Sequence, residues 1–331
     1  MTEFEDLARR IPGDRFWPLP VPTVEGAAER RTGVEIEFSG LTEADAAALV
    51  AALWGGTVVA EGAHALTVEG GRLGEVKVEL DIFLRDKAQS ALADRLLDLS
   101  REVVPVEIVT APLTMGDLPE VDRLMDRLDA AGALGSGEGV LLAFGIHLNP
   151  EVAARTADFI VPVARAYALV EHWLRASSPP DPMRRLLPFV NPWPRGFVDR
   201  IAEEGASWDL PRLRDVYLDL VGTRNHGLDL LPLLTELFPE AVRAALPSGQ
   251  VKGGRPTWHY RLPETRLGGE HRSIAVEWNR WVLVERVAAE PDLLDRLAFA
   301  WAEHRAALTS FRSDWAHDVN RILAEADIWR G

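Results

Sequence analysis

The stretch Gly33-Val34-Glu35-Ile36-Glu37-Phe38 decides how this chain of 331 residues is expected to fold. Apolar and acidic side chains alternate along it, and successive side chains of a β-strand point to opposite faces. Val34, Ile36 and Phe38 would therefore lie on one face, and Glu35 and Glu37 on the other. One apolar face and one polar face are typical of a strand in a half-buried antiparallel sheet.

Four more segments repeat this alternation, at residues 76–82, 106–110, 144–149 and 260–266. The polar positions of the five segments include Glu35, Glu37, Lys77, Glu79, Asp81, Glu107, His147, Asn149, Glu264 and Arg266. The solvent face of an ordinary sheet is richer in Thr, Ser, Lys and Arg. Neighbouring strands that carry this many carboxylates would repel one another unless cations lay between them.

Clustered carboxylate oxygens are the ligands that Mg²⁺ or Mn²⁺ requires, and substrate phosphates can complete the octahedron. The pattern therefore indicates a divalent-metal site on the polar face, provided that the segments are neighbouring strands. An ordinary solvated sheet face is the alternative, because spacing alone does not show which strands pair.

Composition excludes several classes of function. Lys plus Arg number 36 and Asp plus Glu number 51, which gives a net charge of −15. A chain this acidic lacks the excess of positive charge that binds nucleic acid or anionic lipid. The chain has no cysteine, which excludes disulfides, thiolate metal sites and a Cys nucleophile. It also lacks a membrane span of about 18 apolar residues, and its acidic N-terminus is unlike a signal peptide. We expect a cytoplasmic protein of undefined oligomeric state.

The chain is expected to form one continuous α+β unit over residues 31–331, preceded by a Pro-rich extension over residues 1–30 on the surface or over a cleft. A helical insertion is expected at about residues 150–250. Strands are predicted at 31–38, 63–69, 75–83, 104–110, 140–148 and 257–267. Helices are predicted at 42–54, 86–102, 117–132, 151–175, 211–221, 228–246 and, with breaks at Pro291 and near Thr309, 275–327.

Residues 33–38 resemble the first-strand signature of the amidoligase family, a group of carboxylate–amine ligases related to glutamate–cysteine ligase and glutamine synthetase. Three more segments resemble motifs of this family and follow in the same order. Residues 107–113 resemble its E-(I/V)-V-(S/T)-x-P-L segment, residues 144–149 resemble its G-x-H-x-(H/N) strand, and residues 260–266 resemble its late strand with E-x-R. A weaker match lies at 223–229, where Asp229 stands in place of the family's Asn. The resemblance covers about residues 31–290.

The resemblance implies a curled antiparallel sheet, as in glutamine synthetase and glutamate–cysteine ligase, with helices on its outer face and with ATP and Mg²⁺ (or Mn²⁺) on its concave face. It also implies an acyl-phosphate mechanism. Carried over residue by residue, the metal ligands would be Glu35, Glu37, Glu107, His147 and Glu264. Arg266 would contact the transferred phosphoryl group and, with Glu264 and Glu35, form the catalytic set; an arginine fork matches phosphate well.

Other basic residues are candidates for nucleotide binding. Lys252 begins the loop Lys252-Gly253-Gly254-Arg255, which could close over phosphates or could be a surface turn. Arg224 could bind nucleotide or the amine, or could cap a helix, and Arg261 shares a strand with the E-x-R motif. Glu79, Asp81 and Asn149 stay open as ligands. His64, His172, His259, His271, His304 and His317 show no metal-ligand spacing such as H-x-x-x-H.

The function expected first is an ATP- and Mg²⁺-dependent ligase that joins a small-molecule or peptide carboxylate to an amine. One alternative is a non-catalytic binding or scaffold domain that keeps the ligase fold. Another is a metal-dependent hydrolase or a glycosidase that uses paired carboxylates. The sequence identifies neither the acid nor the amine.

Overall fold

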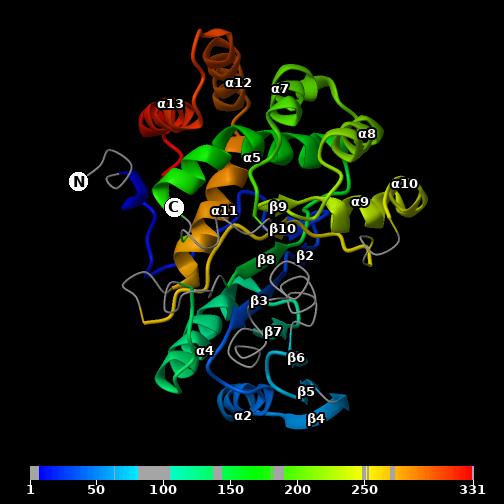
Figure 1. Cartoon of the computed structure of the whole chain (residues 1–331), viewed down its shortest axis with the longest axis vertical. Helices are drawn as coiled ribbons and strands as arrows, with labels where there is room; N and C mark the ends of the chain where they lie inside the picture. Colours follow the sequence, from blue (N-terminus) through cyan, green and yellow to red (C-terminus); the bar gives the residue numbers. More distant parts are fainter. Residues whose placement is uncertain are drawn as a thin grey trace, which may run out of the picture.

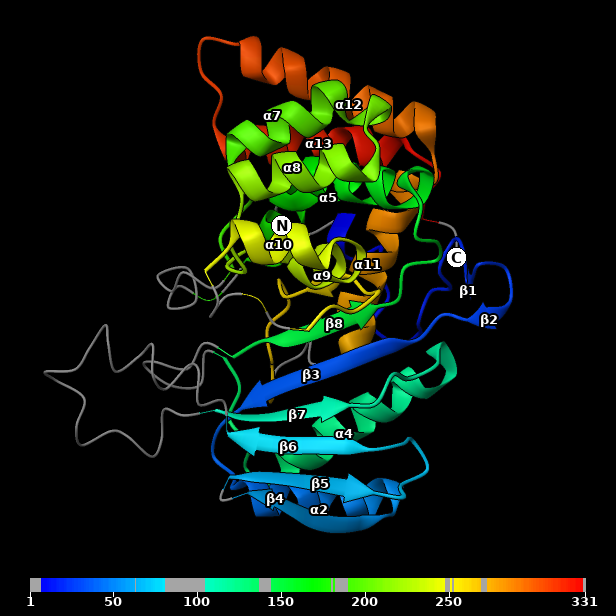
Figure 2. The same ribbon diagram turned by 90° about the vertical axis from the view of Figure 1, so that its right-hand side faces the viewer.

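The computed structural model describes residues 7–62, 64–80, 105–136, 144–179, 181, 190–247, 251, 253–268 and 273–329. An eight-stranded sheet crosses these residues in the order β4-β5-β6-β7-β3-β8-β10-β9 (Figures 1 and 2). Every pairing in it is antiparallel, and the sheet is open, with β4 and β9 at its edges. The chain is therefore α+β, as the sequence predicts.

The segments with alternating sequence form adjacent strands in the middle of this sheet. These segments give β3, β6, β7, β8 and β10. The strands of the whole sheet are β3 (Thr32–Phe38), β4 (Thr57–Gly62), β5 (Ala65–Glu69), β6 (Val76–Leu80), β7 (Val106–Thr110), β8 (Ile146–Pro150), β9 (Leu228–Asp229) and β10 (His259–Tyr260). The apolar side chains of β3, Val34, Ile36 and Phe38, are fully buried. Their burial fixes the register, because a slip of one residue would turn these side chains to the polar face.

The late strand differs from its prediction. A strand over 257–267 is expected, but regular pairing is confined to His259–Tyr260, followed by a single bridge between Gly145 and Glu264. Pro263 lacks the N–H that a regular ladder needs, which explains the interruption. The edge strand β4 is absent from the sequence predictions because most of its residues are exposed and show no one-sided alternation.

Helices α2 (Glu43–Trp54) and α4 (Leu118–Ala130) lie on the apolar side of the sheet (Figures 1 and 2). The predicted capping box of α2 is confirmed, because Thr42 and Asp45 exchange hydrogen bonds at its start. The predicted apolar stripe of α4 is buried from Leu118 to Leu128. These helices leave the opposite, polar face of the sheet to the candidate site.

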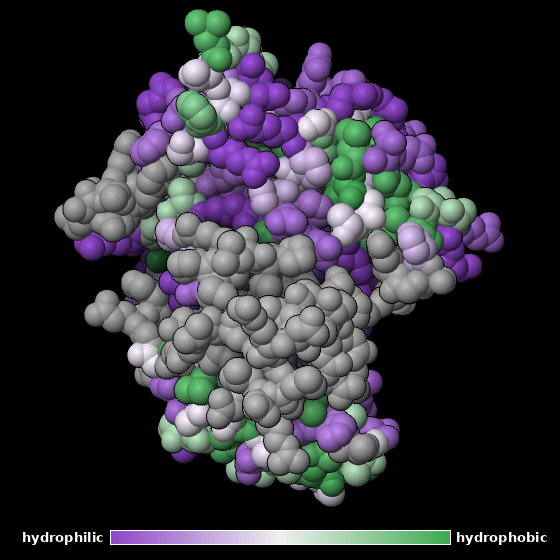
Figure 3. All heavy atoms as spheres, in the orientation of Figure 1, coloured by the Kyte–Doolittle hydropathy of each residue, from purple (hydrophilic) through white to green (hydrophobic). Residues whose placement is uncertain are grey.

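A second helical layer covers the β8–β10 end of the sheet (Figure 1). It consists of α5 (Ala157–Ser177), α7 (Arg195–Glu204), α8 (Leu210–Leu220), α9 (Leu231–Leu237), α10 (Pro239–Ala245), α11 (Ile274–Ala288), α12 (Pro291–Ala306) and α13 (Arg312–Glu325). The predicted breaks at Pro291 and near Thr309 are confirmed. Hydrophilic residues cover much of the described surface of this layer in Figure 3.

Two helical predictions are wrong in their bounds. The helix expected from residue 151 begins at Ala157, because Glu151 bridges Thr257 and Val152 donates its N–H to the carbonyl of Pro256. The helix expected over 228–246 splits at Pro239, and its first two residues form β9. The helix expected over 86–102 lies outside the described residues.

Residues 7–30 pack against the core and include two short strands, β1 (Thr23–Val24) and β2 (Ala28–Glu29). Trp17 is buried, and its backbone N–H donates to Asn279 Oδ1 of α11 at 2.7 Å. Arg30 forms a buried ion pair with Glu285 of the same helix at 2.7 Å. Among the helices that the structure describes, none combines the length and the apolar character needed to cross a membrane.

Candidate functional site

The strand register gathers the predicted acidic residues on the polar face. In one row across the strands, Glu107 is the partner of both Glu79 and Glu37. In the next row, Glu35 lies between Val109 and His147. The like charges that the sequence pattern predicts therefore face each other across hydrogen-bonded strands, where they repel unless a cation or a hydrogen-bond donor intervenes.

His147 of β8 lies between two glutamates of β3. Its Nδ1 is 2.7 Å from Glu35 Oε2, and its Nε2 is 3.5 Å from Glu37 Oε1. The other oxygen of Glu37 accepts the backbone N–H of Gly145 at 2.7 Å, which fixes the direction of that carboxylate. One ligand atom each from Glu37, Glu107 and His147 lies within 4.8 Å of the others, so these three side chains could hold a metal ion.

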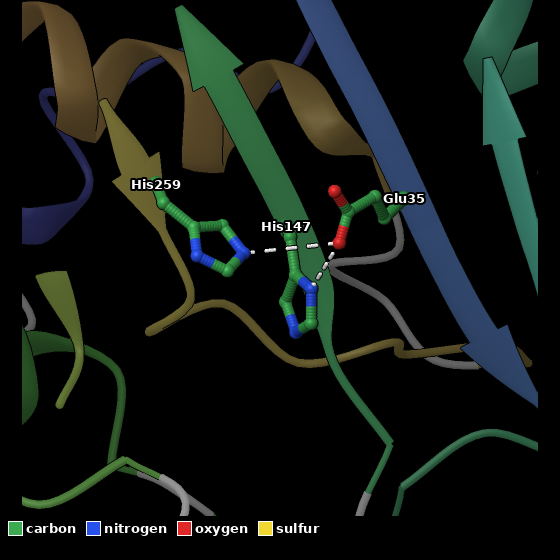
Figure 4. A group of neighbouring side chains, drawn as sticks. All are labelled: Glu35, His147 and His259. Carbon is green, nitrogen blue, oxygen red and sulfur yellow. Dashed lines mark hydrogen bonds and ion pairs between the residues drawn. The ribbon is translucent and has the colours of Figure 1, made fainter. Parts of the chain in front are cut away.

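A second group of three potential ligands consists of Glu35, His147 and His259, with the same 4.8 Å limit (Figure 4). His259 Nε2 is 3.8 Å from Glu35 Oε2, and His259 Nδ1 is 3.1 Å from Asp229 Oδ2. His147 belongs to both groups, and a neutral imidazole offers a lone pair on only one ring nitrogen. It can therefore ligate a metal in one group at a time.

His259 and Asp229 are the residues that sequence reasoning missed. His259 has no nearby histidine in sequence, since its partners come from β3 and β8 rather than from one helix. A signal was nevertheless present, because Trp258 and Tyr260 are buried and apolar while His259 and Arg261 alternate with them. The same alternation that identified Glu35 would have placed His259 on the polar face.

Burial and charge set the protonation states of this centre. Burial acts to raise the pKa of Glu35, but its hydrogen bond with His147 and its interactions with His147 and His259 hold that pKa well below its ordinary value. Burial lowers the pKa of His147, against the opposing effect of Glu37 and Glu35. An ionised carboxylate and a neutral imidazole are the forms that bind a metal, so both groups are ready to act as ligands at neutral pH.

Asp229 is fully buried beneath His259. Burial would raise its pKa, but His259 and Arg224 together lower it to about 2. Arg224 Nε donates to Asp229 Oδ2 at 3.0 Å, and Arg261 donates to the carbonyl oxygen of Arg224 at 2.7 Å. Two of the arginines expected to bind nucleotide, Arg224 and Arg261, therefore lie beside the Asp229–His259 pair.

Glu264 and Arg266 lie on the far side of β8 from Glu37. The bridge between Gly145 and Glu264 brings Glu264 to this side, where its Oε1 accepts the N–H of Asp181 at 2.7 Å. Arg266 donates to Glu264 Oε2 at 3.2 Å. Glu264 belongs to neither of the two ligand groups found among the described residues.

The remaining candidates divide between contacts and undescribed positions. Asn149 donates to Glu35 Oε1 at 2.9 Å and so orients this carboxylate. Glu79 continues the acidic row on β6. Lys252 and Asp81 lie outside the described residues, but Gly254 of the basic loop packs against the backbone of Glu236, where a Cβ would come within 2.5 Å of a nitrogen.

An open pocket of about 530 Å³ borders Glu35 on the polar face. Lys77 and Arg255 line it together with Asn149, and Arg255 reaches to 3.8 Å from Glu35 Oε1. This volume lies within the range of pockets that bind small molecules. The lining also includes the carboxylates of Glu75 and Glu151, so an anionic ligand could bind here through Lys77 and Arg255 and through a metal ion at Glu35.

Comparisons with known proteins agree with this geometry. The model of a family described as "Putative amidoligase enzyme" matches residues 28–283. The matched region includes β3, β7, β8 and β10 and every residue of the two ligand groups. No curated protein and no solved structure matches the chain. Because the family match covers most of its length, this chain belongs to the amidoligase family.

Proposed function

We propose that this protein is an ATP- and Mg²⁺-dependent carboxylate–amine ligase. The observation that carries the proposal is the convergence of Glu35, Glu37, Glu107 and His147 on one face of the sheet, beside a pocket with cationic side chains. Membership of the amidoligase family supports an amide-forming reaction. The antiparallel sheet, with helices on its apolar side, is consistent with the catalytic sheet of glutamine synthetase and glutamate–cysteine ligase.

The residues fit a magnesium ion because their donor set is oxygen-rich. Glu37 and Glu107 would hold it, with His147 as a third ligand when that imidazole binds no other metal, and the ion would supply a positive charge that neutralises nucleotide phosphates. Arg266, Arg261 and Arg224 are the candidates to contact phosphate oxygens. Phosphoryl transfer asks a protein mainly for positioning and charge neutralisation, which this set of residues offers without a nucleophilic side chain.

The proposed reaction has two steps. A carboxylate oxygen of the acid bonds to the γ-phosphorus of ATP, the bond from that phosphorus to its bridging oxygen breaks, and ADP leaves. The amine nitrogen then bonds to the acyl carbon, phosphate leaves, and the nitrogen loses a proton. Residues that hold the acyl phosphate away from water would favour the amine over hydrolysis.

Two measurements test the proposal. First, the non-hydrolysable analogue AMP-PNP with Mg²⁺ is expected to raise the thermal midpoint of the full chain, because a ligand that binds only the folded state stabilises it. Second, ATP, Mg²⁺, pools of carboxylic acids and hydroxylamine as a general amine are expected to yield ADP and a hydroxamate. Each effect should be lost in Glu35→Gln.

Glu61→Gln is the matched control, since Glu61 is exposed on the edge strand β4 of the same sheet. It should behave as the wild type in both assays. Absence of any AMP-PNP effect in the wild type would contradict the proposal and favour a scaffold domain. Turnover of an amide or ester without ATP would favour a metal-dependent hydrolase.

A further inference from the structure

We infer that Glu35, His147 and His259 form a binding site for a divalent transition-metal ion such as Zn²⁺. Asp229 contacts the other ring nitrogen of His259, Nδ1, and so orients this ligand. This site goes beyond the proposed ligase function, because its three ligands would bind the ion without a nucleotide. The inference starts from the arrangement of the three side chains in Figure 4.

The ligand atoms already lie close to a metal-binding arrangement. Glu35 Oε2 lies 2.7 Å from His147 Nδ1, in a hydrogen bond that a metal ion would replace with release of the proton, and 3.8 Å from His259 Nε2. The two imidazole rings stand edge to face, at an interplanar angle of 85°. Ligands about 2.0–2.2 Å from a tetrahedral zinc ion are roughly 3.5 Å apart, so small side-chain rotations would suffice.

His259 Nε2 makes no hydrogen bond among the described residues, although Glu35 Oε2 lies 3.8 Å from it. The side chain of His259 is 8% exposed. Its Nδ1 lies 3.1 Å from Asp229 Oδ2, and in the tautomer that carries the ring hydrogen on Nδ1 the lone pair is on Nε2, towards Glu35. A buried nitrogen without a partner costs free energy, and a metal ion beside Glu35 would remove this cost.

Asp229 is held so firmly that it fixes the orientation of His259. Its Oδ1 accepts the N–H of Leu231 at 2.9 Å, and its Oδ2 accepts Arg224 Nε at 3.0 Å. A carboxylate behind a ligating histidine sets the tautomer and raises the basicity of the ring. The replacement of an amide by Asp229 at the position where the family resemblance expects Asn adds this carboxylate where His259 can use it.

The chemistry of the donors determines which metal the site prefers. Two imidazole nitrogens and one carboxylate suit Zn²⁺ and its neighbours, whereas Mg²⁺ prefers oxygen ligands in an octahedron. Glu35 is oriented for this role as well, because Asn149 binds its Oε1 and leaves Oε2 towards the two histidines. The group of Glu37, Glu107 and His147 has more carboxylates and is better suited to Mg²⁺.

The experiment measures metal binding to the full chain, stripped with a chelator and free of nucleotide. Calorimetric titration should show one Zn²⁺ bound at least about 100-fold more tightly than Mg²⁺. His259→Ala should lose this preference. Asp229→Asn should weaken Zn²⁺ binding about 10- to 100-fold. His64→Ala, at an exposed histidine that hydrogen-bonds Glu43, should match the wild type.

X-ray absorption at the zinc edge of the loaded wild type needs no variant, and two imidazole ligands are expected. Zn²⁺ bound no more tightly than Mg²⁺, a folded His259→Ala that keeps the preference, or fewer than two imidazoles would each overturn the inference. If AMP-PNP binds but Zn²⁺ does not, only the transition-metal site fails. If Zn²⁺ binds as described but AMP-PNP does not, only the ligase proposal fails.

Discussion

Gly227 lies where a methyl group has no room. A Cβ there would stand 2.5 Å from the Tyr167 hydroxyl and 3.1 Å from a guanidinium nitrogen of Arg175. Both groups bind the buried carboxylate of Glu171, which also accepts the backbone N–H of Trp193. This network holds the chain just before β9, and hence Asp229, against α5.

Gly227→Ala should therefore destabilise the protein by about 1–3 kcal/mol, because overpacking forces the network apart. Urea unfolding measures the change in the free energy of unfolding. Gly196→Ala in α7 is the matched control, since no atom lies within 4 Å of its Cβ position and alanine suits a helix. Equal stabilities for the two variants would contradict this account of Gly227.

His172 of α5 makes stability depend on pH. Burial, assisted by Arg312 and Arg175 and opposed by Glu171, lowers the pKa of His172 from 6.5 to about 4. The folded state therefore binds fewer protons than the unfolded state between these values. The stabilising contribution of neutral His172 is complete above pH 6.5 and is lost as the pH falls towards 4.

His172→Gln should remove this dependence. The free energy of unfolding of the wild type, relative to that of the variant, should fall by about 2–3 kcal/mol between pH 7 and pH 4.5. Urea unfolding of both proteins at the two pH values checks it. The comparison cancels the contributions of other titrating groups, so a constant difference between the proteins would show that His172 is not the cause.

At the level of single residues, the alternation of apolar and polar positions predicted that Glu35, Glu37, Glu107 and His147 lie on polar strand faces, but it did not show that their strands are neighbours. These residues lie on strands long enough to show the period of two. His259 and Asp229 belong to two-residue strands whose pairing joins positions far apart in the sequence. Such short segments give too little periodicity to reveal which residues they face.

The start of α2 offers a prediction for one element. Thr42 Oγ1 accepts the N–H of Asp45 at 3.1 Å, and Asp45 in turn accepts the N–H of Thr42. Thr42→Ala should cost about 1 kcal/mol, because the Asp45 N–H loses its acceptor and the Asp45 carboxylate loses the hydrogen bond from the Thr42 hydroxyl. Thr42→Ser keeps the hydroxyl and should stay near wild-type stability. Thermal unfolding would contradict this if the alanine and serine variants melted together.

Elements with strong local signals were predictable, and those set by distant contacts were not. The cap at Thr42 and the buried stripe of α4 depend on residues that are close together in the sequence. The start of α5 is delayed because residues 151–152 pair with 256–257, about a hundred positions away. The break at Pro239 was visible in the sequence, but its effect on the register of α9 and α10 was not.

At the scale of the whole molecule, the two faces of the sheet have different roles: one packs against helices and the other carries the candidate site. Its apolar face packs against α2 and α4, while β10 packs against α5 and α11 through Tyr260, which contacts Tyr167 and Trp281. Its polar face is left with the carboxylates and histidines of the candidate site. The α+β class followed from the sequence, but the full strand order did not, because the edge strands β4 and β9 carry no distinguishing pattern.

The claim at the centre of this account is that the polar face of the sheet binds divalent cations and a nucleotide. Anomalous diffraction from crystals grown with Mn²⁺ and AMP-PNP tests it most directly. The account predicts a manganese peak within ligand distance of Glu37, Glu107 or Glu35, with the nucleotide phosphates beside it on the same face. Manganese and nucleotide bound elsewhere, or no manganese among these residues, would contradict it.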